Sequence, residues 1–208
     1  MFNLLLPHAL TDIPYHWGSV SPFIRADIAK NLMETFPTDG FIVAEKTVEE
    51  TNDKKTYSLE TLRIEKDTPL SPVWREFVEY LKSDQYRKRM EKLIGQDLSS
   101  TILNLTLWRY RSAQWLGPHT DKTEKIVTQI FNFNHNWSQD WGGCLRILRS
   151  DDSQDVYREI PPELNTAVIL QRSDQSWHMV TPITDSAPEA TYRRVLTAAF
   201  VSRSGPEK

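Results

Sequence analysis

Residues 101–133 read TILNLTLWRYRSAQWLGPHTDKTEKIVTQIFNF. The runs Thr101–Tyr110 and Ile126–Phe133 at the two ends of this stretch are rich in β-branched and aromatic side chains, a composition typical of β-strands. Between them, residues 116–121 (LGPHTD) interrupt the pattern with Gly and Pro. The stretch therefore predicts two strands on either side of a short extended segment that carries His119 and Asp121.

The chain that follows continues in the same way. Further strands are expected at Cys144–Leu148, Val156–Ile160, Ala167–Arg172, Ser176–Pro182 and Arg194–Ser202. They are short, and polar turns rather than helices separate them. This order favours an antiparallel sandwich or barrel over alternating parallel βαβ units.

The first hundred residues carry the helical signals. Ser21-Pro22 places an N-cap residue before a proline at the first helical position, and Ser71-Pro72 repeats this opening. A third helix is expected to end at Gly95, because Gly adopts the left-handed C-terminal conformation at little cost. The expected elements are helices over residues 21–36, 71–81 and 84–94, extended segments at Phe41–Lys46 and Tyr57–Ile64, and a turn at Asn52–Lys55. The whole chain is therefore predicted to be mainly β with supporting helices, an α+β fold.

The composition limits the class of protein. The chain has 208 residues, of which 39% are hydrophobic, enough for one core of ordinary size. A formal net charge of -3 argues against a protein whose main task is to bind nucleic acid or an anionic membrane. No apolar run approaches the roughly 20 residues of a membrane helix. The single cysteine, Cys144, cannot form an internal disulfide, so we expect a reducing, cytoplasmic setting. We expect one domain over residues 1–208, with 1–100 as a helix-rich support and 101–208 as the core.

Three side chains in the strand-rich half form a candidate metal site. Residues two apart on an extended chain point to the same side, so His119 and Asp121 can approach one ion. His178 can supply a third ligand. Two imidazoles and one carboxylate are the donor set of non-haem Fe(II) oxygenases, because they leave positions open for a bidentate cosubstrate and O2.

The alternative is that these residues are structural. His-x-Asp is a common tripeptide, and a lone histidine such as His178 is more often a core or surface residue than a ligand. The other histidines, His8, His16 and His135, have no partner at ligand spacing and are expected to be structural or surface residues.

Five ordered motifs decide between these interpretations. They are residues 108–121 (WRYRSAQWLGPHTD), 127–137 (VTQIFNFNHNW), 141–148 (WGGCLRIL), 177–183 (WHMVTPI) and 193–197 (RRVLT). Together they resemble the prolyl 4-hydroxylase-like, 2-oxoglutarate- and Fe(II)-dependent dioxygenases over about residues 101–203. In that family, a Tyr on the incoming strand precedes His-x-Asp, as Tyr110 does here.

The resemblance implies a double-stranded β-helix, a jelly-roll or cupin-like barrel over residues 101–208 whose mouth holds iron. The earlier helices would brace its outer face. His119, Asp121 and His178 would be the metal ligands and the catalytic centre. The enzyme would need Fe(II), 2-oxoglutarate as cosubstrate and O2, and would couple oxidative decarboxylation of 2-oxoglutarate to hydroxylation of a substrate C–H bond.

The resemblance also implies a basic residue on the last strand that binds the far carboxylate of 2-oxoglutarate. Arg193 and Arg194 point to opposite faces of an extended strand, and the family pattern favours Arg193. Arg194 stays open as the alternative, because strand register can slip by one residue. Tyr110, Thr128 and Asn132 are expected to assist, with Asn132 standing where many relatives have Tyr.

We therefore expect a dioxygenase that hydroxylates an unactivated C–H bond of a small molecule, with a free or carrier-bound amino acid as the preferred class. A protein or peptidyl (prolyl-type) hydroxylase is the runner-up. From another class, a non-redox cupin-like binding barrel would need neither iron nor Arg193. No nucleic-acid or membrane partner is expected, and the oligomeric state is left open.

Overall fold

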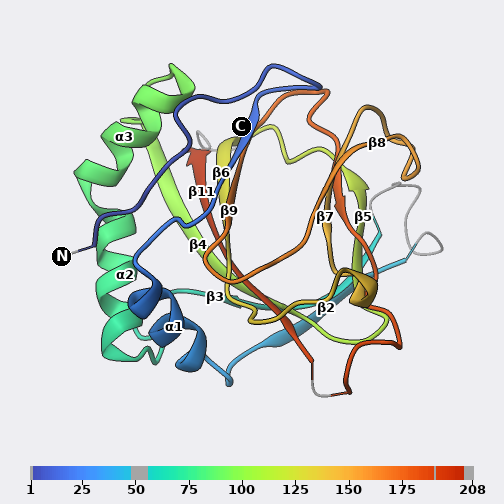
Figure 1. The fold of residues 1–208 in the computed structure, drawn as a ribbon. Helices are drawn as coiled ribbons and strands as arrows, with labels where there is room; N and C mark the ends of the chain where they lie inside the picture. The colour runs from blue at the N-terminus through green and yellow to red at the C-terminus, as the bar shows by residue number, and fades with distance from the viewer. Residues whose placement is uncertain (1, 48–55, 190, 204–208) are drawn as a thin grey trace, which may run out of the picture.

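A curled β-sheet and a layer of helices make up the fold (Figure 1). The computed structural model describes residues 2–47, 56–189 and 191–203. The strands are β1 (Trp17–Val20), β2 (Ile42–Lys46), β3 (Tyr57–Arg63), β4 (Thr101–Tyr110), β5 (Trp115–His119), β6 (Lys125–Asn132), β7 (Leu145–Leu148), β8 (Val156–Ile160), β9 (Ala167–Gln171), β10 (His178–Val180) and β11 (Arg193–Ser202). The helices are α1 (Ala26–Glu34), α2 (Pro72–Lys82), α3 (Asp84–Ile94) and the 3-10 turn η2 (Gln139–Trp141). The predicted turn at Asn52–Lys55 lies outside the described residues.

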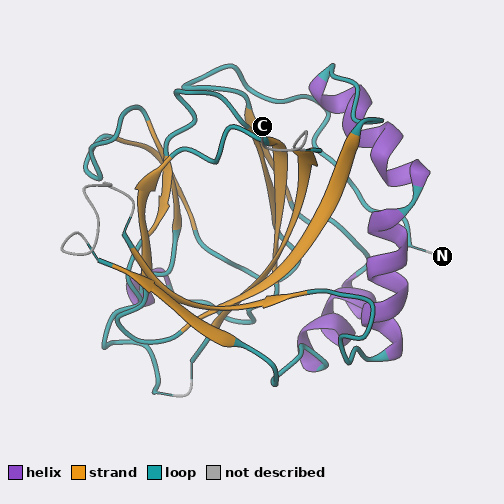
Figure 2. Ribbon diagram, turned by 180° about the vertical axis from the view of Figure 1, so that it is seen from behind, coloured by secondary structure: helices purple, strands orange, loops and turns teal. Residues whose placement is uncertain are grey.

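The sheet curls into a barrel-like shape, and the edge strands of its main path are β1 and β8. Hydrogen-bonded neighbours follow the order β1-β9-β6-β11-β4-β3-β5-β10-β7-β8, with β2 paired to β3. The pairings between these strands are antiparallel. In the ribbon views, β5 and β7 stand across from β4, β6, β9 and β11 (Figures 1 and 2). The predicted α+β class and the double-stranded β-helix are confirmed.

Alternate residues of the long strands face two different environments. On β11, Leu196, Ala198 and Phe200 belong to the apolar core shared with the helices, whereas Val195 belongs to a second core inside the curl. This follows from the period of two along a strand, because successive side chains leave opposite faces of the sheet. A polar residue in phase with Val195 therefore lies inside the curl.

The helices cover only one face of the sheet (Figure 2). Helix α2 starts as predicted, with the Ser71 hydroxyl accepting a hydrogen bond from the Trp74 amide, and α3 ends at Gly95 with φ of 68°. Phe77 of α2 packs edge-on against Phe131 of β6, with ring centroids 5.4 Å apart. Among the described residues, no helix is long and apolar enough to cross a membrane.

The prediction for the first helix is wrong at its start. Helix α1 begins at Ala26 rather than at Ser21-Pro22, and its N-cap Arg25 makes no side-chain capping bond. The preceding segment is held by Asn165, whose side-chain oxygen accepts hydrogen bonds from the amides of Phe23 and Ile24. A distant tertiary contact thus overrides the local helix signal. The short strand β1, paired with β9, was not predicted.

Candidate metal centre

Strand pairing brings the three predicted ligands together. His178 at the start of β10 lies directly opposite His119 at the end of β5, and Asp121 follows two residues later. One potential ligand atom from each of the three residues lies within 4.8 Å of the other two. All three side chains are buried, and the two imidazole rings have centroids 4.2 Å apart. This arrangement can hold a single metal ion.

Backbone carbonyls fix the orientation of both imidazoles. Nδ1 of His119 lies 2.9 Å from the Gly117 carbonyl oxygen, and Nδ1 of His178 lies 2.9 Å from the Ser176 carbonyl oxygen. A carbonyl accepts only, so each ring carries a proton on Nδ1, and in the neutral form of the ring the lone pair lies on Nε2. Both rings therefore present Nε2 as the nitrogen that can ligate a metal.

The backbone at Gly117 has no room for a side chain. A Cβ there would lie 2.9 Å from the Thr56 hydroxyl oxygen and 3.1 Å from the Thr56 carbonyl oxygen. The Gly117 amide instead donates to that carbonyl at 2.8 Å. Because Gly117 has no side chain, the segment before His119 lies close enough to Thr56 for this backbone hydrogen bond to form.

Both carboxylate oxygens of Asp121 have protein partners. Lys125 Nζ donates to Oδ1 at 2.7 Å, and the Thr128 hydroxyl donates to Oδ2 at 3.1 Å. Burial alone would raise the pKa of the Asp121 carboxyl, but the charge of Lys125, followed by those of His178 and His119, holds this pKa well below its usual range. The carboxylate is therefore ionised and oriented before any ligand binds.

The triad opens into a cavity inside the curl, of about 90 Å³. Its walls come from both halves of the sheet: Trp108, Tyr110, Leu116, His119, Asp121, Lys125, Thr128, Ile130, Leu145, Leu170, His178, Val180, Arg193, Val195 and Thr197. About half of these residues are apolar, and the polar ones are the triad with its two partners, a tyrosine, a threonine and one arginine. Such a cavity suits a small ligand held by a few polar groups.

Arg193 is the distinctive group of this cavity. Only 2% of the residue is exposed, and the buried Nε has no hydrogen-bond partner in the described part of the chain. No carboxylate of the described residues forms an ion pair with it; its guanidinium instead lies 5.0 Å from the centroid of the Tyr110 ring. Burial lowers the pKa of Arg193, yet an arginine stays charged in proteins. A buried cation without a counter-ion is costly, so the site suits an anionic ligand.

The structure separates the two candidate arginines. Arg193 lines the cavity, as predicted from the strand phase, whereas Arg194 is half-buried over the Phe36 ring on the other face of β11. Tyr110 and Thr128 also line the cavity. Thr128, however, directs its hydroxyl to Asp121.

Asn132 is not among the residues that line the cavity. Its side-chain nitrogen donates to the Thr166 hydroxyl at 2.9 Å, and Thr166 lies just before β9. The buried side-chain oxygen of Asn132 has no hydrogen-bond partner among the described residues, and the role of Asn132 in cosubstrate binding stays a prediction. Asn132 lies opposite the cavity-lining Val195 of β11, so its phase on β6 is the predicted one.

Two functional contacts were missed by the sequence analysis. Lys125 pairs with Asp121, and the Trp108 indole donates to the Thr197 hydroxyl at 2.8 Å across the cavity wall. Lys125 lies just before the predicted strand Ile126–Phe133, and its contact with Asp121 depends on how the chain turns between β5 and β6. The Trp108–Thr197 bond joins strands far apart in sequence, and no local pattern announces it.

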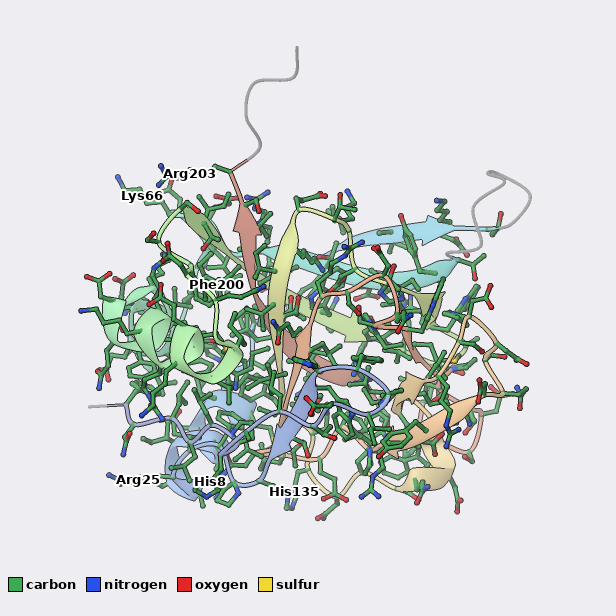
Figure 3. All side chains as sticks on the ribbon, turned by 90° about the horizontal axis from the view of Figure 1, so that it is seen from above. His8, Arg25, Lys66, His135, Phe200 and Arg203 are labelled. Atoms are coloured by element: carbon green, nitrogen blue, oxygen red, sulfur yellow. The ribbon has the colours of Figure 1, made fainter. Side chains whose placement is uncertain are left out.

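The remaining histidines take no part in the centre. His8, His16 and His135 are exposed, and Figure 3 places His8 and His135 at the periphery of the molecule. His16 faces Asp12 on the surface at 3.2 Å. The expectation that these three are structural or surface residues agrees with their positions.

Comparisons with known proteins agree with the fold and the donor set. Residues 105–195 match the model of the 2OG-Fe(II) oxygenase superfamily, whose members use Fe(II), 2-oxoglutarate and O2. No curated protein sequence matches the chain significantly.

Solved structures share the architecture at low sequence identity. A Pseudomonas putida prolyl-4-hydroxylase superposes with a TM-score of 0.65 at 16% identity, covering 90% of this chain and 93% of that one. A Trichoplax adhaerens prolyl hydroxylase, in complex with a hypoxia inducible factor peptide fragment, gives a TM-score of 0.63 at 14% identity, covering 89% and 83%. EvdO2 from Micromonospora carbonacea, complexed with 2-oxoglutarate, gives 0.56 at 12% identity, covering 90% and 86%.

Proposed function

We propose that the chain is a dioxygenase that hydroxylates an unactivated C–H bond of a small molecule, and the match of residues 105–195 to the model of the 2OG-Fe(II) oxygenase superfamily supports this. A free or carrier-bound amino acid is the candidate substrate class. One observation carries the proposal: the His119–Asp121–His178 cluster and the uncompensated Arg193 line the same buried cavity. A metal and an anionic cosubstrate can therefore be held side by side.

The residues that line the cavity fit both Fe(II) and 2-oxoglutarate. Two imidazole nitrogens and one carboxylate suit Fe(II), and three protein ligands would leave positions on the ion for other ligands. Arg193, stacked near Tyr110, would hold the far carboxylate of 2-oxoglutarate, because a guanidinium binds a carboxylate through two parallel hydrogen bonds. When bound, the iron supplies the O2 chemistry that couples 2-oxoglutarate oxidation to hydroxylation.

The chain contributes orientation and enclosure. Lys125 and Thr128 hold the Asp121 carboxylate in one pose, so its ligand geometry is set before the metal arrives. Apolar walls that include Leu145 and Leu170 shield the Arg193 side of the cavity from water. Exclusion of water strengthens the interaction of Arg193 with an anion and protects reactive species from side reactions.

Two alternatives are ranked by particular observations. The likeness to two prolyl hydroxylases, one in complex with a peptide fragment, supports a peptidyl hydroxylase as the second candidate function. A non-redox binding barrel is less well supported, because it gives no reason to bury Arg193 without a counter-ion beside a metal-type donor set.

The test is O2-dependent conversion of 2-oxoglutarate to succinate by the Fe(II)-loaded protein. We expect slow basal turnover that a true substrate accelerates, and loss of turnover in His178→Ala. His135→Ala is the matched control, because it removes an exposed histidine and should keep full activity. Candidate substrates are free amino acids and a proline-containing peptide. Acceleration by the peptide alone would favour the second candidate, and turnover that survives His178→Ala would contradict the proposal.

A further inference from the structure

A second cavity adjoins the metal centre. It has a volume of about 580 Å³ and shares His119 and Asp121 with the first cavity, but not Arg193. It opens to solvent, since Lys122 on its wall is exposed. A molecule bound here would reach the two metal-binding side chains from the side away from Arg193.

The wall of this second cavity is rich in positive charge. Lys46, Lys122 and Arg172 line it, whereas its only carboxylate among the described residues is Asp121. In the proposed function, Asp121 is bound to the metal and its charge is used there. Of these cations, Arg172 and Lys122 are the ones that can face an anion entering the cavity.

Arg172 is held in place rather than freely mobile. Its side chain is 20% exposed, and its Nε donates to the Asp121 carbonyl oxygen at 3.4 Å. Its Nη2 donates to Asp174, which is 88% exposed, and such exposed partners bind weakly. Nη1 has no hydrogen-bond partner within the described part of the chain. The guanidinium thus keeps donor capacity for a ligand.

Two neighbours complete a binding surface. The ammonium of exposed Lys122 has no ion pair with any described residue, so it adds a second cation to the cavity that Arg172 lines. Tyr57 and Trp177 contribute aromatic surface to the same wall. Aromatic faces hold the apolar body of a small molecule while charged groups hold its anionic end.

We propose that the substrate of this centre carries an anionic group, a carboxylate or a phosphate, which binds Arg172 and Lys122 in the second cavity. The body of the substrate then lies along Tyr57 and Trp177, toward His119 and Asp121. This inference rests on the proposed function, and it narrows the substrate class to acidic small molecules.

The test measures binding rather than turnover. The protein is loaded anaerobically with Mn(II) and 2-oxoglutarate, so that the Arg193 cavity is filled, and 2-oxoglutarate binding is recorded first by calorimetry. Phenylacetate, phenyl phosphate and neutral phenylacetamide are then titrated. We expect the preferred anion to bind at least about tenfold more tightly than the amide, the gain of one well-placed charge-assisted contact. The ranking of phenylacetate against phenyl phosphate identifies the anionic group.

Variants separate charge from structure. Arg172→Gln should remove the preference for the anion, whereas Arg172→Lys should keep most of it, because a cation remains. Arg158→Gln is the matched control, since Arg158 is an exposed arginine of β8 that lines neither cavity. Each variant must still bind 2-oxoglutarate as wild type does, which shows that the Asp121 segment is intact.

The outcomes are distinct. Equal binding of the anions and the amide, or equal effects of Arg172→Gln and Arg158→Gln, would overturn the inference while leaving the proposed function in place. Failure of the loaded protein to bind 2-oxoglutarate at all would instead contradict the proposed function.

Discussion

The two faces of strand β11 differ sharply. Leu196, Ala198 and Phe200 face the helices in a largely apolar core, whereas Arg193 and Thr197 face the cavity inside the curl. The outer face stabilises the fold through burial of apolar surface. The inner face places a charged group where burial is unfavourable, which a folded protein tolerates at sites that bind a ligand. Stability and function are thus assigned to opposite faces of the same strand.

The largest expected effect lies on the outer face. Phe131→Ala removes a fully buried ring that packs edge-on against Phe23 and Phe77. We expect the free energy of unfolding to fall by about 3–5 kcal/mol, measured by denaturant titration. Tyr157→Ala, a change at a 37% exposed aromatic residue, is the control and should cost far less. Equal losses in the two variants would remove the distinction between the faces.

A substitution on the inner face should raise the free energy of unfolding, whereas Phe131→Ala lowers it. In Arg193→Met, an uncompensated buried cation is replaced by an apolar side chain of similar length. We expect unfolding to require about 1–4 kcal/mol more free energy. The affinity for 2-oxoglutarate should fall by about 30-fold or more, the loss of a buried charged contact.

Arg194→Met is the control for this trade between stability and binding. Arg194 lies on the other face of the same strand, so its loss should leave 2-oxoglutarate affinity near that of wild type. An Arg193→Met protein that is less stable, yet binds 2-oxoglutarate normally, would refute the division between the faces.

The smallest effect concerns the residues that orient Asp121. Thr128→Val removes the hydroxyl that donates to this carboxylate but keeps the shape of the side chain. We expect the affinity for Fe(II) or Mn(II) to fall about tenfold, with little change in stability. Thr197→Val is matched to it, because Thr197 also lines the cavity but bonds Trp108 instead. If both variants bind metal equally well, Thr128 does not position the ligand.

The sequence predicted those strands and helix ends that depend on neighbouring residues in the chain. Strand β4 has the predicted bounds Thr101–Tyr110, and α3 ends at Gly95 as expected. The period of two placed Arg193 inside the curl and Arg194 outside it. The metal donor set was predictable because His119 and His178 lie in recognisable sequence motifs. In the structure, the pairing of β5 with β10 sets His119 opposite His178.

Features that depend on distant contacts were not predictable. The start of α1 is set by Asn165, which is distant in sequence, and β1 exists because β9 offers it an edge. The pairing of Lys125 with Asp121 depends on how the chain turns between β5 and β6. Asn132 had the right phase, but Thr166 engages its amide. In each case a tertiary partner decides between local options of similar free energy.

The central claim is that one cavity holds both a metal at the triad and 2-oxoglutarate at Arg193. Anaerobic titration of the protein with Fe(II) and then 2-oxoglutarate tests it directly, through the weak visible charge-transfer band of an iron-bound 2-oxo acid. We predict a band that needs both additions, disappears in His178→Ala and requires much more 2-oxoglutarate in Arg193→Met. Absence of the band in the wild type, or a band unchanged in His178→Ala, would contradict the claim.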